Sequence, residues 1–393
     1  MGPDPGDEGR RVVHVNITDF MAQAEEVRDP SLRGRPFAVG NPRAPRSVLL
    51  GVSRAAYAEG VRPGMGLREA ARICRGLTLV EPDHQLYAAL DGELRGIAAA
   101  HSPRVESPGG GHYFLDIRGT RRLFGPAEDC ANRIRSRVLE RTGLKPAVGL
   151  GANKLVSKVG SRVVKPYGFA AVRPGDEEKF LRPQGVGLLP GVGRKIGERL
   201  ALLGVRTIGG LAEFSDGESA ALGPGGLLLR DRARGIDPRE VDPAAPEERL
   251  VAGSLSFESD TADPQFAAAG LRALAEDLGL RLREDDLATR LLVLGGHYTD
   301  GRRVSFRLRA PEGLRTDGEI GAAALRLLGR VLDRRVRLRG LRLELRDPAP
   351  AVAPLDLFAP RETEKRLSLQ RALDGMRRKY GPDALRSGAA LAR

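Results

Sequence analysis

Apolar residues recur along the chain at two spacings, one typical of strands and the other of helices. Near the start, residues 11–15 form a short apolar run that predicts a buried strand, and residues 20–26 have the spacing of a following helix. Residues 34–50 contain two further β-rich pieces, and helical spacing returns at 53–58 and 67–73. We therefore expect a small mixed subdomain in this part of the chain.

The pattern changes from alternating elements to helices alone in the middle of the chain. Residues 85–101 and 128–141 predict amphipathic helices, and strands are expected near 104–106 and 112–117. From residue 166 to 235, short helical stretches are broken by pairs of glycines. This pattern predicts a small helical domain.

A polar stretch then separates this part from a second body. Residues 238–248 are rich in Asp, Pro, Ala and Glu and have no apolar periodicity, which is the composition of an interdomain linker. The next hundred or so residues alternate between helical, strand-like and turn-forming stretches, namely 266–284, 291–294, 299–301, 304–308, 319–332 and 341–345. They predict an α+β sheet domain. Prolines after residue 347 mark a tail, where 362–380 is interpreted as a core-facing helix or as a docking helix for a partner.

Length and charge narrow the class of protein. A chain of 393 residues is too long for a single core, and with 41% hydrophobic residues it is too apolar to be disordered throughout. Its 64 basic residues exceed its 51 acidic ones, and 56 of the basic residues are Arg. The net charge of +13 makes a polyanion the first partner to consider, with a coding bias toward Arg as the alternative.

Cysteine spacing and hydropathy exclude other classes. Cys74 and Cys130 lie far apart and outside a C-x-x-C spacing, which argues against a disulfide framework and a zinc site. The N-terminus has no apolar leader, and no run of about 18 apolar residues occurs. We therefore expect a cytoplasmic protein that is neither secreted nor associated with a membrane.

The clearest local motif is a glycine-rich turn followed by a helix that begins with two basic residues. Gly191 and Gly193 allow a tight turn, so that amides at the start of the next helix can face a phosphate oxygen without base specificity. Arg194 and Lys195 add positive charge at the same point. This is the pattern of a helix-hairpin-helix, and a plain turn between packed helices is the alternative.

Together with this hairpin, several motifs in order resemble the Y-family, or translesion, DNA polymerases. The matching stretches are 14–20, 32–40, 60–65 and 149–161, which resemble the family's opening strand, fingers strand, fingers turn and last palm segment. The resemblance extends over residues 12–347. It implies an α+β right-hand polymerase fold with palm, fingers and a helix-hairpin-helix thumb, plus a little-finger domain.

The resemblance and the composition together give the expected boundaries. These are palm 11–20 and 82–165, fingers 21–81, thumb 166–237, linker 238–248, little finger 249–347 and tail 348–393. The little finger is expected to contact DNA phosphates through arginines on its strands, namely Arg302, Arg303, Arg307 and Arg309.

The carboxylates that the family uses to bind metal are missing. Polymerising members hold two Mg²⁺ ions with an Asp on the first strand and an Asp-Glu pair on a hairpin strand. The corresponding residues here are Asn16, Gly111 and His112. Asn is a neutral ligand, Gly offers none, and imidazole suits softer metals than Mg²⁺. We therefore expect no metal or other cofactor.

Other carboxylates are not expected to replace them. Asp19, Glu106 and Asp116 are the nearest in sequence, and at least two would have to converge on one side of the palm. Strand alternation does not favour such convergence. Mg²⁺ is expected only if unrecognised ligands hold it.

The nucleotide pocket implied by the resemblance has changed as well. The family grips the triphosphate with a Tyr and an Arg on the fingers helix, and here Arg54 and Tyr57 stand in roughly the reverse order. Met21 occupies the position of the aromatic residue that excludes ribose. Lys158 matches the phosphate-contacting lysine, which can equally hold DNA at the edge of a basic groove.

The tail contains an apolar motif that resembles the clamp-binding peptides of bacterial polymerases. Leu355, Leu357 and Phe358 form a Leu-x-Leu-Phe core, which in those peptides docks into an apolar pocket of the sliding clamp. The usual leading Gln is absent. The alternative is that these side chains pack back on the little finger.

These observations lead to one hypothesis and one rival. The first is a non-catalytic Y-family homologue, similar to the ImuB class of accessory proteins, that binds DNA and scaffolds translesion synthesis. Its expected partners are DNA, the sliding clamp and a separate error-prone DNA polymerase. The rival is an active, template-directed nucleotidyltransferase with unrecognised metal ligands.

Overall fold

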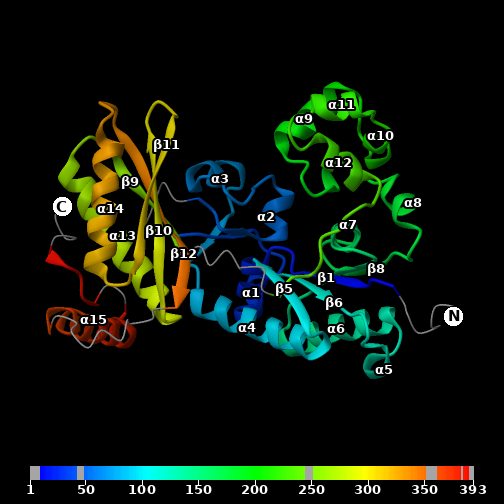
Figure 1. Ribbon diagram of the computed structural model, residues 1–393, viewed down its shortest axis with the longest axis horizontal. Helices are drawn as coiled ribbons and strands as arrows, with labels where there is room; N and C mark the ends of the chain where they lie inside the picture. The colour runs from blue at the N-terminus through cyan, green and yellow to red at the C-terminus, as the bar shows by residue number, and fades with distance from the viewer. Residues whose placement is uncertain (1–8, 42–47, 244–250, 351–360, 382–383, 389–393) are drawn as a thin grey trace. The chain divides into compact units, whose positions relative to one another are not determined.

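The computed structural model describes residues 9–41, 48–243, 251–350, 361–381 and 384–388 (Figure 1). These residues fall into two units, one up to residue 243 and the other from residue 251 onward. The expected α+β architecture is confirmed. The clamp-like motif with Leu355, Leu357 and Phe358 lies outside the described residues.

The first unit is built on a five-stranded palm sheet with the strand order β5-β6-β1-β7-β8. Its first strand is the predicted apolar run, and it lies in the centre between two antiparallel neighbours. The strands are β1 (Val12–Asn16), β5 (Arg104–Gly109), β6 (His112–Asp116), β7 (Ala147–Gly151) and β8 (Gly168–Ala171).

Helices cover both faces of this sheet, and strand alternation decides which residues each face receives. Val13 and Val15 pack with Ile134 and Val138 in the main core, under α4 (His84–His101) and α6 (Ala127–Thr142). The short helix α5 (Arg121–Phe124) precedes α6. The opposite face carries the alternate residues of β1, and α7 (Lys154–Val163) packs on it.

Glycines on β7 allow α7 to approach this closely. A Cβ atom on Gly149 would lie 2.0 Å from the carbonyl oxygen of Ser157, and one on Gly151 would lie 3.0 Å from its amide nitrogen. The first distance is shorter than real Cβ contacts and the second is tighter than most of them, so glycine is required at 149 and favoured at 151. The sheet and α7 therefore meet backbone to backbone.

The fingers form a small three-stranded sheet with the order β3-β2-β4. Its apolar core joins Ala38, Val52 and Val61 with residues of the flanking helices. The elements are α1 (Phe20–Arg28), η1 (Pro30–Leu32), β2 (Phe37–Val39), β3 (Gly51–Val52), α2 (Arg54–Ala58), α3 (Leu67–Ile73) and β4 (Thr78–Val80). The predicted mixed subdomain is confirmed.

The thumb is the predicted bundle of short helices, with a core that includes Leu189, Leu200 and Leu211. Its elements are α8 (Glu177–Leu181), η2 (Val186–Leu188), α9 (Arg194–Leu202), α10 (Ile208–Ala212), α11 (Asp216–Ala221) and α12 (Gly226–Ala233).

The described beginning of the predicted linker packs on the palm. Val241 is fully buried in a small cluster with Val12 and Phe114. The Glu240 carboxylate forms an ion pair of 3.1 Å with Arg104 on β5. Apolar periodicity could not reveal this attachment, because one buried valine in a polar stretch has no period.

The second unit is a four-stranded antiparallel sheet with the order β11-β10-β12-β9. Two helices, α13 (Pro264–Glu284) and α14 (Asp317–Leu332), pack on one face. The strands are β9 (Val251–Thr261), β10 (Leu287–Tyr298), β11 (Arg303–Leu314) and β12 (Leu338–Pro350). The sequence reading missed β9, although Val251, Leu255 and Phe257 stand at alternate positions there and pack on the core.

The helix expected in the tail is integral to this second unit. Helix α15 (Arg361–Tyr380) joins α13 and α14 through charged side chains that are at most 13% exposed. Arg283 pairs with Asp374 at 2.7 Å, and Arg377 pairs with Glu276 at 3.1 Å and with Asp317 at 2.6 Å. A buried charge needs such partners, so this network favours one position of α15 on the unit.

Candidate functional site

The three positions matched to the family's metal ligands lie side by side at one end of the palm sheet. Asn16 is the last residue of β1 and pairs in register with His112 at the start of β6. Gly111 precedes His112 in the hairpin, and the amide of Ile17 donates to the Gly111 carbonyl at 2.9 Å. Asn16, Gly111 and His112, which are far apart in the sequence, therefore lie together in the structure.

The hairpin leaves no room for a carboxylate at Gly111. Its φ of 78° lies in the left-handed region, which favours glycine. A Cβ atom there would lie 2.9 Å from the Cβ of Ile17 and 3.2 Å from the Cβ of Phe20. An Asp at this position would require the hairpin backbone to move.

Two histidines occupy the space beside Asn16. The Nδ1 atom of His14 lies 2.6 Å from the hydroxyl of Ser161, and His14 Nε2 lies 3.3 Å from Nδ1 of His112. Burial and the proximity of His112 and Lys158 hold the pKa of His14 well below its usual range. Burial, followed by the proximity of Lys158, lowers the pKa of His112 to about 4. Both rings are thus neutral at pH 7.

Asn16 differs from its neighbours in having no partner. Its side chain is buried, and neither amide atom makes a hydrogen bond among the described residues. A buried amide without partners costs on the order of 1–3 kcal/mol. It supplies one neutral oxygen to this end of the sheet.

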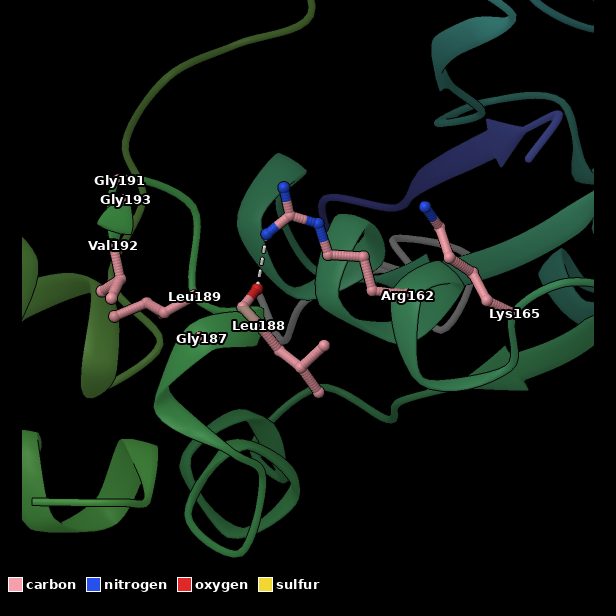
Figure 2. Close-up of a pocket in the computed structure, with 8 residues that line it drawn as sticks. All are labelled: Arg162, Lys165, Gly187, Leu188, Leu189, Gly191, Val192 and Gly193. Carbon is pink, nitrogen blue, oxygen red and sulfur yellow. Dashed lines mark hydrogen bonds between the residues drawn. The ribbon is translucent and has the colours of Figure 1, made fainter. Parts of the chain in front are cut away.

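Basic side chains follow one face of α7 toward the same place. Lys154, Lys158 and Arg162 recur every four residues, so they lie on one side of the helix, and Lys165 follows in the turn after the helix ends (Figure 2). Desolvation, followed by the proximity of Arg162, lowers the pKa of both Lys158 and Lys165 from the ordinary value. We call Lys158, Arg162 and Lys165 the α7 basic row.

The three carboxylates considered as replacement ligands, Glu106, Asp116 and Asp19, share no partner with one another. Glu106 accepts from Lys154 at 2.5 Å, and the backbone amide of Asp242 donates to the same carboxylate at 3.1 Å. Asp116 forms an ion pair with Arg118 at 2.6 Å. Asp19 is partly buried, which raises its pKa. The expectation that these carboxylates do not form a replacement site is consistent with their separate contacts.

These residues do not fit a divalent hard cation. Mg²⁺ requires several oxygen ligands, usually including carboxylates. Among the described residues, no group of three or more His, Cys, Asp or Glu side chains is placed to hold a metal ion. The site offers one amide and two neutral imidazoles that are hydrogen-bonded to each other. The positive charges of the α7 basic row lie next to them and oppose the binding of a cation.

The predicted nucleotide-pocket residues are spread over the fingers and palm. Met21 packs against the backbone of Gly51, where a Cβ would lie 3.2 Å from the Met21 Cβ. The guanidinium of Arg62 lies 3.7 Å from the centre of the Tyr57 ring, so this exposed ring has a cation–π partner. Arg54 is exposed at the start of α2. The sequence reading did not identify Arg62 as the partner of Tyr57.

The thumb hairpin has the predicted glycine-dependent turn. Gly191 has a φ of 105°, and the Gly193 amide donates to the Gly191 carbonyl at 3.2 Å before α9 begins at Arg194. Arg194 and Lys195 are both exposed. Basic side chains and helix amides thus lie at one exposed end of the thumb.

The second unit has a strongly basic sheet face. Arg303, Arg307 and Arg309 alternate on the exposed side of β11, while Val304, Phe306 and Leu308 pack toward the core. Arg302 is exposed in the turn before β11. Alternation therefore places the predicted arginines together, opposite the helices.

Two further arginines on this face were missed by the sequence reading. Arg342 and Arg346 are exposed on β12. The registers of β11 and β12 with β10 place them on the same face as the β11 arginines. Both donate to Glu344, at 2.7 and 2.8 Å. Their alternation with Leu341, Leu343 and Leu345 was a signal available in the sequence.

The sequence reading also missed Arg162 and Lys165 in the palm. Their spacing after Lys158 was the available signal.

Comparison with family models decides the relationship. The impB/mucB/samB family model matches residues 15–162, and the model of that family's C-terminal domain matches residues 251–353. Together these matches cover more than half of the chain. This chain belongs to the Y-family of DNA polymerases.

Y-family relatives cover almost the whole chain. A DNA polymerase IV from Methanoculleus marisnigri is 36% identical over 86% of this chain and 94% of its own length. A DNA polymerase IV from Bacillus velezensis is 30% identical over 98% of this chain and 94% of its own. The predicted Y-family membership is therefore confirmed.

Solved structures support the same fold. The Y-family DNA polymerase chimera Dbh-Dpo4(243-245)-Dbh has a TM-score of 0.76 and 21% identity, with 86% of this chain and 98% of that chain covered. The DinB protein from Sulfolobus solfataricus has a TM-score of 0.58 with the same coverage and identity. The predicted right-hand polymerase fold is confirmed. Within the described ranges, every helix is too short or too polar to cross a membrane.

The two histidines predict a pH dependence of stability. The pKa of His112 is about 4 in the folded protein, and that of an unfolded histidine is 6.5. Between these values the unfolded state binds more protons, so stability is full above pH 6.5 and falls as the pH drops toward 4. The full shift corresponds to at most about 3 kcal/mol.

We expect His112→Gln to flatten the dependence of the thermal midpoint on pH in this window. Scanning calorimetry of both proteins across the range measures the difference. His84→Gln is the control, since His84 lies at the start of α4 and away from this pair. Equal slopes for the parent and His112→Gln would contradict the neutral state of the partly buried His112.

Proposed function

We propose that this Y-family protein binds DNA without catalysing nucleotide transfer and acts as a scaffold in translesion synthesis. In this role it resembles the ImuB class of accessory proteins and works beside a separate error-prone polymerase. The sliding clamp is its proposed point of recruitment.

The composition of the palm site carries this proposal. Two-metal catalysis requires anionic ligands that hold the ions and neutralise the charge of the triphosphate. At the three corresponding positions the chain has Asn16, Gly111 and His112, with Gly111 in a conformation and packing that exclude a side chain. The charges that act on His112, those of Lys158, Lys165 and Arg162, are positive.

An active polymerase is the second candidate. The relatives named DNA polymerase IV favour it, since they match nearly the whole chain. Catalysis by this chain would require metal ligands other than those at the three matched positions. The engaged state of Glu106 and Asp116 argues against their use as such ligands.

Two basic surfaces support the DNA-binding half of the proposal. The sheet face of the second unit presents Arg303, Arg307 and Arg309 in a row, and the thumb presents Arg194 and Lys195 beside a glycine turn. Arginine and lysine contacts to phosphates give binding that is strong, salt-dependent and indifferent to sequence.

Recruitment to the clamp rests on the sequence of the tail motif. Leu355, Leu357 and Phe358 are large apolar residues between prolines in a polar stretch, which suits an extended peptide. The motif follows β12 and precedes α15, and both of these elements belong to the second unit.

The first prediction from this proposal concerns catalysis. We expect no primer extension above background with Mg²⁺ or Mn²⁺, because the ligand set cannot hold two ions. Asn16→Asp should not restore it, since one carboxylate is insufficient. Asn16→Asp combined with Gly111→Asp and His112→Glu should also fail, because the hairpin has no room at Gly111. Robust template-dependent extension by the unaltered protein would establish the enzyme instead.

The second prediction concerns DNA binding. Arg307→Ser with Arg309→Ser should weaken binding to unrelated duplex sequences about equally and lower the salt slope by about two units, one per lost phosphate contact. Fluorescence anisotropy at several salt concentrations measures both effects. Lys195→Glu should act in the same direction.

A matched control removes two charges from the helical side of the same unit. Arg281 and Arg326 are exposed on α13 and α14, opposite the arginine face. Arg281→Ser with Arg326→Ser should change affinity much less. If both pairs of substitutions have the same effect, net charge and not the sheet face accounts for binding.

The third prediction concerns the clamp. Leu357→Ala with Phe358→Ala should abolish binding to the cognate sliding clamp, since burying each side chain contributes about 1.5–3 kcal/mol. DNA affinity should not change. Calorimetry with the full chain and with a peptide of residues 352–361 measures the clamp interaction, for which we expect micromolar affinity because the leading Gln is absent. A double variant that binds as well as the parent would remove clamp recruitment from the proposal.

A further inference from the structure

Helix α15 of the second unit (Figure 1) has large apolar side chains on its solvent-exposed side. Leu369, Met376 and Tyr380 are 62%, 44% and 60% exposed. The partly buried Leu373 stands between Leu369 and Met376, and residues at these spacings lie on one side of a helix. We call Leu369, Leu373, Met376 and Tyr380 the α15 apolar stripe.

The side of α15 that packs on the rest of the unit is polar. Gln370, Asp374 and Arg377 are all buried there. The backbone amide of Asp317 donates to the side-chain oxygen of Gln370 at 3.0 Å, and Asp374 and Arg377 form the ion pairs with α13 and α14 described above. A surface helix normally packs through its apolar face, so the use of the two faces is reversed here. The exposed residues of the stripe are therefore left for a contact outside the unit.

The spacing of the stripe is that of a helix–helix seam. Its four residues follow one another at intervals of four, three and four, which are the intervals between the a and d positions of a heptad. From Leu369 to Tyr380 the helix rises by about 16 Å, or about three turns. The stripe is thus long and narrow, and it suits the apolar seam of a second helix.

The exposed edge of this seam is basic. Lys365 and Lys379 occupy the positions directly before a heptad a position, where charged residues select the partner helix. The Lys379 ammonium lies 5.1 Å from the centre of the Tyr380 ring. Between residues 365 and 380 the single acidic residue is Asp374, which is buried in the ion network. The exposed charges of this stretch are all cations, namely Lys365, Arg366, Arg371, Arg378 and Lys379.

This charge decides which occupant fits the stripe. A second copy of α15 would bring the same cations together beside the seam, and like charges at flanking positions oppose pairing. A membrane surface takes helices with a broad apolar face, whereas a seam of a and d positions alone is narrow. A helix with its own apolar seam and acidic flanks complements both the shape and the charge.

We propose that the α15 apolar stripe is a docking site for an acidic amphipathic helix of a partner protein. The apolar seam of that helix packs on Leu369, Met376 and Tyr380, and its Glu or Asp side chains pair with Lys365 and Lys379. This inference rests on the scaffold role proposed above and gives the chemistry of one protein contact of the scaffold. It involves neither the arginine face of the second unit nor the tail motif.

The test uses the full chain and two designed helical peptides of three heptads, both with Leu at the a and d positions. One peptide has Glu at the flanking e and g positions, and the other has Lys there. Calorimetry should show micromolar binding of the Glu peptide and no binding of the Lys peptide. Leu369→Ala with Tyr380→Ala should weaken binding of the Glu peptide about a hundredfold, or about tenfold for each buried side chain that is lost.

A charge swap tests the acidic character of the partner. Lys365→Glu with Lys379→Glu should abolish binding of the Glu peptide and create binding of the Lys peptide. The matched control is Arg326→Glu with Arg371→Glu, which reverses two exposed charges of the same unit away from the stripe. The control should bind the Glu peptide within about twofold of the parent, since salt screens distant charges. Thermal midpoints equal to that of the parent verify the fold, and the swap alone decides if the truncated variant unfolds.

Loss of binding on truncation, together with the reversed preference of the swap, supports the docking site. Equal binding of both peptides, or no binding of the Glu peptide at millimolar concentration, overturns it. Two other results also overturn it. Self-association of the parent that is lost on truncation would assign the stripe to a second copy, and truncation-sensitive binding to vesicles that contain phosphatidylglycerol would assign it to a membrane surface.

DNA binding and primer extension by the same variants separate this inference from the proposed function. DNA affinity should not change in the Leu369→Ala, Tyr380→Ala variant. If the Glu peptide fails to bind while DNA binding still depends on Arg307 and Arg309 and no primer is extended, only the docking site is overturned. If the unaltered protein extends primers and also binds the Glu peptide through the stripe, only the non-catalytic role is overturned.

Discussion

The close approach of α7 to β7 is the contact on which the palm depends. It exists because Gly149 and Gly151 have no side chain where the helix backbone passes, and at Gly149 a Cβ atom would lie only 2.0 Å from a helix carbonyl oxygen. This contact fixes the height of α7 above the sheet. It therefore determines where Lys158 and Arg162 stand relative to the histidines at the end of β1 and β6.

The charges at that end of the sheet follow from the same arrangement. In a two-metal polymerase, carboxylates and cations balance one another across the site. Here the three matched positions carry no carboxylate, and no carboxylate of the described residues forms an ion pair with Lys158, Arg162 or Lys165. His14 and His112 can be accommodated beside them because both rings are neutral, held by hydrogen bonds to each other and to Ser161. The lack of carboxylates at positions 16, 111 and 112 and the neutral state of the histidines thus fit the same basic environment.

The second unit keeps its buried charges apart from its exposed arginines. Arg283 and Arg377 are buried among Asp317, Asp374 and Glu276, where they fasten α15 to the domain. The arginines of β11 lie on the opposite side of the sheet, exposed to solvent. The same residue type therefore serves packing in one place and a basic surface in the other, and only its partners distinguish the two uses.

The sequence by itself determined the family, the order of the domains and the absence of carboxylates at positions 16, 111 and 112, since these depend on residue identity and local spacing. The sequence also singled out Arg303, Arg307 and Arg309 on the strands of the little finger. The tertiary structure decided what long-range contacts control: the fit of Gly111 against Ile17 and Phe20, the pairing of His14 with Ser161, and the meeting of Arg162 with the thumb loop at Leu188. Such contacts join residues far apart in the chain, and no local period or motif records which of them will meet.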